Sequence, residues 1–180
     1  MVNLTKTREY VRILACLVLT LTSASFAWSQ TLWNGTSYGM SLEQVRRAIP
    51  AAVPPASNPD RLADGAQELL RLENVDLVEN KFSAAFFFRD GKLSQVTLSL
   101  DKGNSFRTTM LVFDSLTQAL RAKYGKELSH RSDRGILNMV QSEWLSGRTN
   151  INLNAVGVGD NDASLNINYQ VRLSREANKL

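Results

Sequence analysis

Two segments in the last third of the chain alternate between amide and apolar side chains, at about residues 149–156 and 164–172. Successive side chains of a β-strand point to opposite faces of a sheet, so a period of two predicts strands with one buried and one open face. The open face would carry Asn150, Asn152, Asn154, Asn166, Asn168 and Gln170. The buried face would carry Ile151, Leu153, Leu165, Ile167, Tyr169 and Val171.

Further strands are predicted on both sides of the middle of the chain. Their approximate ranges are 67–77, 81–89, 93–100 and 136–144. Asp90-Gly91 is a strong hairpin signal, and turns are also predicted at Ser146-Gly147 and from Gly157 to Asp162. In the second of these strands, alternation would bury Phe82, Ala84, Phe86 and Phe88 and place Phe87 on the opposite face. Gln95, Thr97 and Ser99 would join the amides on the open face.

Two helices are predicted from capping signals and apolar spacing. Ser41 followed by Gln44 forms a capping-box pattern, and Pro50 stops the helix that it opens, with a loop over residues 50–65. A longer helix runs from about Ser105 to Tyr124. Its apolar side chains recur every three or four residues, and Gly125 is a typical stop signal.

These elements predict an α+β fold in which helices pack on one face of an antiparallel β-meander sheet. The order helix, meander, helix, meander also points to a tandem repeat. Ser41-Leu42-x-Gln44-x-x-Arg47-Ala48 recurs 74 residues later as Ser115-Leu116-x-Gln118-x-x-Arg121-Ala122. The few identities make this a candidate duplication, over about residues 31–101 and 104–173, within a single domain spanning residues 28–180.

The first 27 residues have the pattern of a cleavable secretory signal peptide. Lys6, Arg8 and Arg12 precede an apolar run from Ile13 to Leu21, and Ser25-Phe26-Ala27 offers a cleavage site. The apolar run is too short for a spanning helix, which needs about 20 residues, so we expect no permanent membrane span after cleavage. A periplasmic or secreted bacterial location is therefore predicted.

The single cysteine, Cys16, lies inside this signal, so the mature chain would contain no disulfide. An alternative is a lipidated Cys16, but the apolar run continues beyond it, which a lipoprotein signal would not do. The chain has 21 basic and 17 acidic residues. Removing the signal leaves 18 and 16, with no basic stripe, so no nucleic-acid binding is predicted.

No catalytic, metal or cofactor motif stands out, and the chain is predicted to be a non-enzyme without a cofactor. His130 is the only histidine and lies in a polar run, residues 129–134, where a solvated loop is expected. The segment from Gly157 to Asp162 favours a hairpin turn over a calcium loop, because it has no glutamate at EF-hand spacing. Acids for glycoside hydrolysis occur on the predicted strands, without an evident pair: Glu68, Glu73, Asp76, Glu79 and Glu143.

Several short motifs carry a resemblance to a known group of domains. They are Trp33, Gly39-Met40-Ser41, the segment Leu116 to Gly125, Trp144, Thr149-Asn150-Ile151-x-Leu153 and Leu165-x-Ile167-x-Tyr169. Across most of the mature chain they resemble the helix-plus-meander units of the β-lactamase-inhibitor-protein-like and SmpA/BamE-like groups. The resemblance implies the fold given above and a non-enzymatic binding role, in some members through a sheet face that holds a partner protein.

The leading functional hypothesis is an exported binding module that holds a protein or cell-envelope component on its open amide face. Phe87 and Trp144 would add aromatic anchors if their burial is incomplete. A second hypothesis is a proteinaceous inhibitor or immunity protein directed against an exported hydrolase. A third is an envelope hydrolase that uses paired carboxylates, which requires two acids converging in one cleft.

Overall fold

The computed structural model describes residues 30–56, 58–102, 105–159 and 162–172. The predicted signal peptide, residues 1–27, lies outside this part of the chain. The described elements are α2 (Leu42–Ala48), β1 (Gln67–Leu77), β2 (Asn80–Arg89), β3 (Lys92–Leu100), α3 (Phe106–Tyr124), β4 (Ser129–Asp133), β5 (Leu137–Ser146), β6 (Thr149–Val158) and β7 (Asp162–Val171). The α+β class is therefore confirmed.

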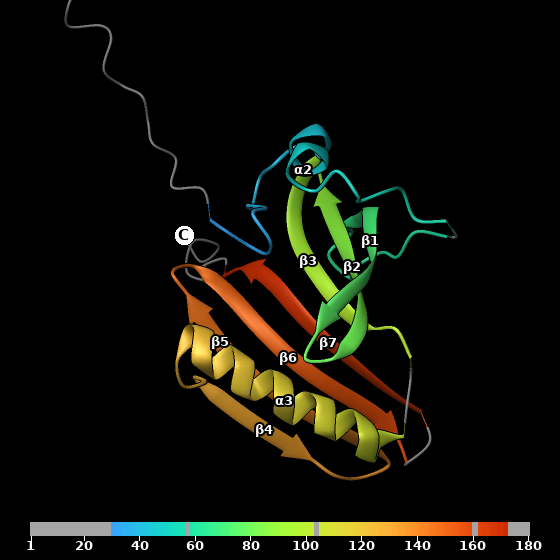
Figure 1. Cartoon of the computed structure of the whole chain (residues 1–180), viewed down its shortest axis with the longest axis vertical. Helices are drawn as coiled ribbons and strands as arrows, with labels where there is room; N and C mark the ends of the chain where they lie inside the picture. The colour runs from blue at the N-terminus through green and yellow to red at the C-terminus, as the bar shows by residue number, and fades with distance from the viewer. Residues whose placement is uncertain (1–29, 57, 103–104, 160–161, 173–180) are drawn as a thin grey trace, which may run out of the picture.

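The strands form one seven-stranded sheet in the order β1-β2-β3-β7-β6-β5-β4, with every neighbouring pair antiparallel. Hairpins join consecutive strands within each half, and the two halves meet where β3 pairs with β7 (Figure 1). The predicted turn from Gly157 to Asp162 is shorter than expected, because β6 continues to Val158 and β7 begins at Asp162.

The prediction for residues 129–134 is wrong. The polar run around His130 was expected to be a loop, and it is the edge strand β4. An edge strand with polar side chains on both faces has no apolar alternation to reveal it, and its pairing with β5 supplies the backbone hydrogen bonds that define it.

The helix ends follow the capping signals in the sequence. Ser41 accepts a hydrogen bond from the backbone N–H of Gln44, while the Gln44 side chain accepts one from the Ser41 N–H. Gly125, at φ 84°, caps the C-terminus of α3 in a conformation that favours glycine. Two hydrogen bonds from Arg121 then hold Glu127 beyond the helix and lower its pKa to about 2.

The main core combines residues of the sheet and of both helices. It includes Val45 of α2, the C-cap residue Ile49, four residues of α3 and the apolar alternation positions of β2, β3, β5, β6 and β7. The contacts of α3 are with β5, β6 and β7, whereas α2 contacts β3 (Figure 1). The predicted buried set of β6 and β7 is confirmed, as is the predicted burial of Phe82, Ala84, Phe86 and Phe88.

Gly157 marks a close contact between β6 and the start of α3. A Cβ at this position would lie 2.7 Å from Cδ2 of Phe106 and 3.3 Å from the carbonyl oxygen of Asp162. We expect Gly157→Ala to lower the free energy of unfolding by about 1–3 kcal/mol, because the added methyl overpacks the core. Chemical denaturation measures this.

Gly135 provides a matched control, since a Cβ there has no atom within 4 Å among the described residues. Gly135→Ala should change the free energy of unfolding by less than about 0.5 kcal/mol. Adding Phe106→Leu to Gly157→Ala should recover part of the loss. Equal stability of the two alanine variants would show that Phe106 moves aside without cost.

Candidate functional site

The sheet register brings the predicted amide residues together on the face that points away from α3. Asn152 pairs with Asn168, which in turn pairs with Thr97 of β3. The neighbouring rows are Asn150 with Gln170 and Gln95, and Asn154 with Asn166 and Ser99. We call these nine residues the amide face. Gln170 is exposed and the other eight are half-buried, as expected for side chains that pack against one another on the open face of a sheet.

Hydrogen bonds link part of this face into a network. The Thr97 hydroxyl donates to Oδ1 of Asn168 at 2.9 Å, and Nε2 of Gln95 donates to the Thr97 hydroxyl oxygen at 2.9 Å. On the neighbouring strand, Glu143 accepts hydrogen bonds from Gln141 at 2.7 Å and Asn152 at 3.4 Å. The side chains at the centre are thus held in defined orientations.

Asn154 lies outside this network, and its side-chain oxygen is buried without a hydrogen-bond partner among the described residues. A buried unpaired acceptor costs about 1–3 kcal/mol, and asparagine is also disfavoured in strands. Asn154→Val should therefore raise the free energy of unfolding, by about 1 kcal/mol in thermal or chemical denaturation. Asn166→Val, at the paired position, should give a smaller gain. A destabilised Asn154→Val variant would mean that the amide makes a favourable contact.

An exposed apolar group adjoins the amide face at one end, and the sequence interpretation missed it. Leu137 of β5 pairs with Val158 of β6, and Met139 pairs with Val156. Leu137 is 49% exposed and Val158 is 61% exposed. Each of the four side chains is two or four positions along its strand from Gln141 or Asn154, so all four point to the same face of the sheet as these two residues. Continuing the alternation of inward and outward side chains toward the start of β5 and the end of β6 would have identified this apolar group.

The two predicted aromatic anchors are not available to a partner. Phe87 lies on the expected face, paired with Gln95, but it is only 3% exposed. It forms a small second cluster with Ala66, Ala85 and the partly buried Leu62. Trp144 faces the main core, where its indole N–H donates to the carbonyl oxygen of Gly125 at 3.0 Å. The sequence could not show that residues 62–66 fold over Phe87.

A buried ion pair holds the segment that covers Phe87. The carboxylate of Glu68, with 0% exposure, accepts hydrogen bonds from Nε and Nη2 of Arg71 at 2.6 and 2.8 Å. It also accepts one from the backbone N–H of Asp60 at 3.1 Å. The hydrogen bonds from Arg71 to Glu68 raise the pKa of the arginine. Glu68 therefore has a structural role, and it is no longer a candidate among the acids considered for catalysis.

Two of the predicted acids, Glu73 and Asp76, line one pocket beside β1, where Asp76 pairs with Lys81 at 2.7 Å. His130 on β4 lies with Nδ1 2.9 Å from the hydroxyl oxygen of Ser142, but Ser142 is completely buried, so this hydroxyl is closed to a substrate. Within the described ranges, no three His, Cys, Asp or Glu side chains are grouped as metal ligands. None of the described helices combines the length and hydrophobicity needed to cross a membrane.

Comparison with known proteins adds no relative. The chain matches no protein-family model, no curated protein and no solved structure. The resemblance to the β-lactamase-inhibitor-protein-like and SmpA/BamE-like groups therefore stays a prediction. Functional inference rests on the chemistry of the amide face itself.

Proposed function

We propose that this protein is an exported, non-enzymatic binding module that holds a partner protein of the cell envelope on its amide face. One observation carries the proposal: β6 and β7 have an amide at six of their outward positions in the middle of the sheet. Asparagine is disfavoured in strands, where threonine or valine would be more stable. Departures from local preference of this kind are expected at functional sites.

The chemistry of the face suits a protein partner. Amides both donate and accept hydrogen bonds, and they can be covered without the large desolvation cost of a buried charge. The exposed Leu137, Met139 and Val158 would supply the apolar contact area that protein interfaces combine with a polar surround. Methionine in particular is enriched at interfaces.

Export is part of the same proposal and has its own test. Lys6, Arg8 and Arg12 with the apolar run and Ser25-Phe26-Ala27 support cleavage after Ala27. N-terminal sequencing of protein isolated from the periplasm or medium should begin at Trp28. Full-length protein confined to the cytoplasm would contradict the proposal.

We also infer that the helices share one side of the sheet and that the two helix-plus-meander halves are a tandem repeat.

Affinity capture from envelope extracts tests the amide face. The double variant Asn152→Lys/Asn168→Lys places two charges at its centre, which should abolish retention of the partner. The matched control Gln118→Lys/Ala122→Lys adds the same charges to exposed positions of α3 and should retain it. Circular dichroism confirms that both variants fold. A partner retained equally by the two variants would contradict the proposal. Inhibition of a captured hydrolase would identify the module as an inhibitor.

A further inference from the structure

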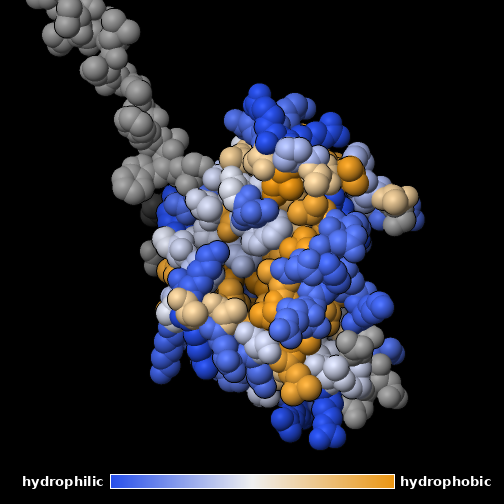
Figure 2. Space-filling view, viewed as in Figure 1, coloured by the Kyte–Doolittle hydropathy of each residue, from blue (hydrophilic) through white to orange (hydrophobic). Residues whose placement is uncertain are grey.

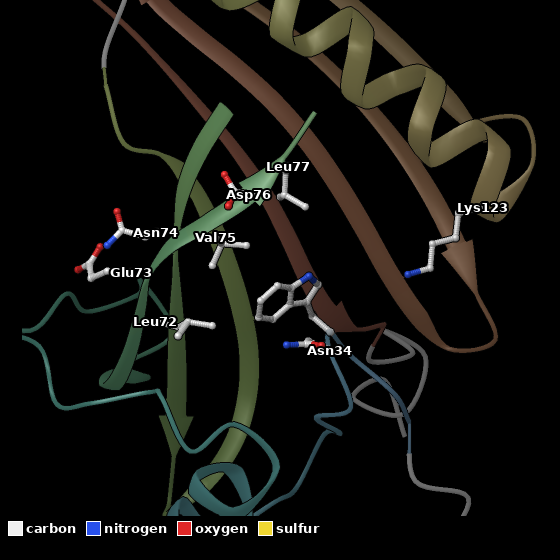
Figure 3. A pocket seen from close by; sticks show the side chains of 9 residues that line it. Asn34, Leu72, Glu73, Asn74, Val75, Asp76, Leu77 and Lys123 are labelled. Atoms are coloured by element: carbon white, nitrogen blue, oxygen red, sulfur yellow. The ribbon is translucent and has the colours of Figure 1, made fainter. Parts of the chain in front are cut away.

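A second surface with a different chemistry lies on the side of the sheet that faces the helices. It is a cleft of about 450 Å³ between the second half of β1, the segment around Trp33 and the end of α3. Leu72, Val75 and Leu77 point into it, while Glu73 and Asn74 point away on the other side of β1 (Figure 3). The cleft therefore has an apolar floor.

The described helices pack mainly on strands other than β1, which leaves the cleft open. The 19-residue α3 contacts β5, β6 and β7, but α2 has only 7 residues and contacts β3. Trp33, Leu72, Val75 and Leu77 pack against the main core and remain partly exposed. Figure 2 shows the apolar surface between the region of α2 and that of α3. Apolar surface beside a strand edge is typical of interaction sites.

The cleft follows an open strand edge. The outer edge of β1 pairs with the preceding loop only as far as Arg71, which exchanges backbone hydrogen bonds of 2.9 and 2.7 Å with Val53. Beyond Arg71, no other described segment forms backbone hydrogen bonds with this edge as far as Leu77. Residues 72–77 all line the cleft, and a β-bulge at Glu73 and Asn74 lets both Leu72 and Val75 point into it. The backbone groups of the edge beyond this bulge are available to an added strand.

The charges around the cleft favour an acidic ligand. Asp76 is paired with Lys81 at 2.7 Å, and Glu73 lies 4.0 Å from Arg71. Lys123 reaches into the cleft from the end of α3 (Figure 3) and has no carboxylate partner among the described residues. Its ammonium lies 5.2 Å from the ring centroid of Tyr124. Lys123 thus brings to the cleft a positive charge that no described carboxylate neutralises, whereas the carboxylate of Glu73 points away on the other side of β1.

We propose that this cleft binds an extended peptide segment of a partner protein, which adds a strand to the open edge of β1. An apolar side chain of the peptide packs on Trp33 and Leu77, and an adjacent carboxylate pairs with Lys123. The open shape along a strand edge favours a peptide over an acyl chain, because a peptide also satisfies the backbone groups of the edge. This site is separate from the amide face and does not depend on it.

Panning a phage-displayed random octapeptide library on the folded protein tests the proposal. Peptides with an apolar residue beside an aspartate or glutamate should be enriched. A synthetic copy of an enriched peptide should bind Lys123→Glu at least tenfold more weakly than the unchanged protein. Lys126→Glu, an exposed lysine outside the cleft, should bind it without loss. Val75→Glu, which places a charge on the apolar floor, should also weaken binding.

Two results would overturn the proposal. One is that panning enriches no peptide. If oleate then binds the protein and the Lys123→Glu variant does not bind it, the cleft would be assigned to an acyl chain instead. The other is an enriched peptide that binds Lys123→Glu and Val75→Glu with unchanged affinity. The variant Asn152→Lys/Asn168→Lys should still bind the peptide, which separates a failure of this site from a failure of the amide face.

Discussion

Replacing Arg71 by alanine should lower the free energy of unfolding by about 3–5 kcal/mol, because it leaves the carboxylate of Glu68 buried without its ionic partner. Glu68 is completely buried, whereas the Arg71 side chain is 28% exposed. Two of the three hydrogen bonds to this carboxylate come from Arg71. The loss should be measured by urea denaturation at neutral pH.

A double variant separates the charge from the packing. In Glu68→Met/Arg71→Met both charges are absent, and buried ion pairs replaced by apolar residues are often neutral in stability. We expect this variant to recover most of the loss caused by Arg71→Ala. Hydrogen exchange should also show faster opening of residues 58–66 in Arg71→Ala, since Asp60 depends on the same carboxylate. A loss below about 1 kcal/mol in the single variant would contradict this account of the ion pair.

Replacing Trp144 by alanine should cost about 3–5 kcal/mol, as expected for a buried tryptophan whose removal leaves a cavity. The indole also satisfies the carbonyl oxygen of Gly125, where α3 ends. Trp144→Phe keeps most of the ring volume and loses this hydrogen bond, so a smaller loss of about 1–2 kcal/mol is expected.

Ile136 offers the control for this prediction. It is 93% exposed beside β5, and Ile136→Ala should change stability by less than about 0.5 kcal/mol. Thermal denaturation monitored by circular dichroism compares the three variants. Similar melting temperatures for Trp144→Ala and Ile136→Ala would show that the indole is not part of the main core.

The amide face was predictable because its signal is local. In β6 and β7 each position alternates, so side-chain direction follows from the sequence without knowledge of the partners of these strands. The burial of Leu153 and Ile167 follows from the same pattern. Helix ends at Ser41 and Gly125 were predictable for a similar reason, since capping depends on neighbours within a few residues.

Features that depend on distant contacts were not predictable. The pairing of β3 with β7 joins segments about 70 residues apart, and no local pattern specifies it. The burial of Phe87 depends on a loop held by Glu68, and the cleft at Trp33 depends on how little of the sheet α2 covers. The edge strand β4 lacks apolar alternation, so its sequence looks like a loop.

The most direct test of the proposed function is site-specific photo-cross-linking in the living cell. A photo-reactive phenylalanine analogue replaces Asn168 at the centre of the amide face, and in a second strain it replaces Gln118 on the exposed side of α3. We predict one discrete adduct with an envelope protein at position 168 and none at position 118. No adduct at position 168, or the same adduct at both positions, would contradict a partner held on the amide face.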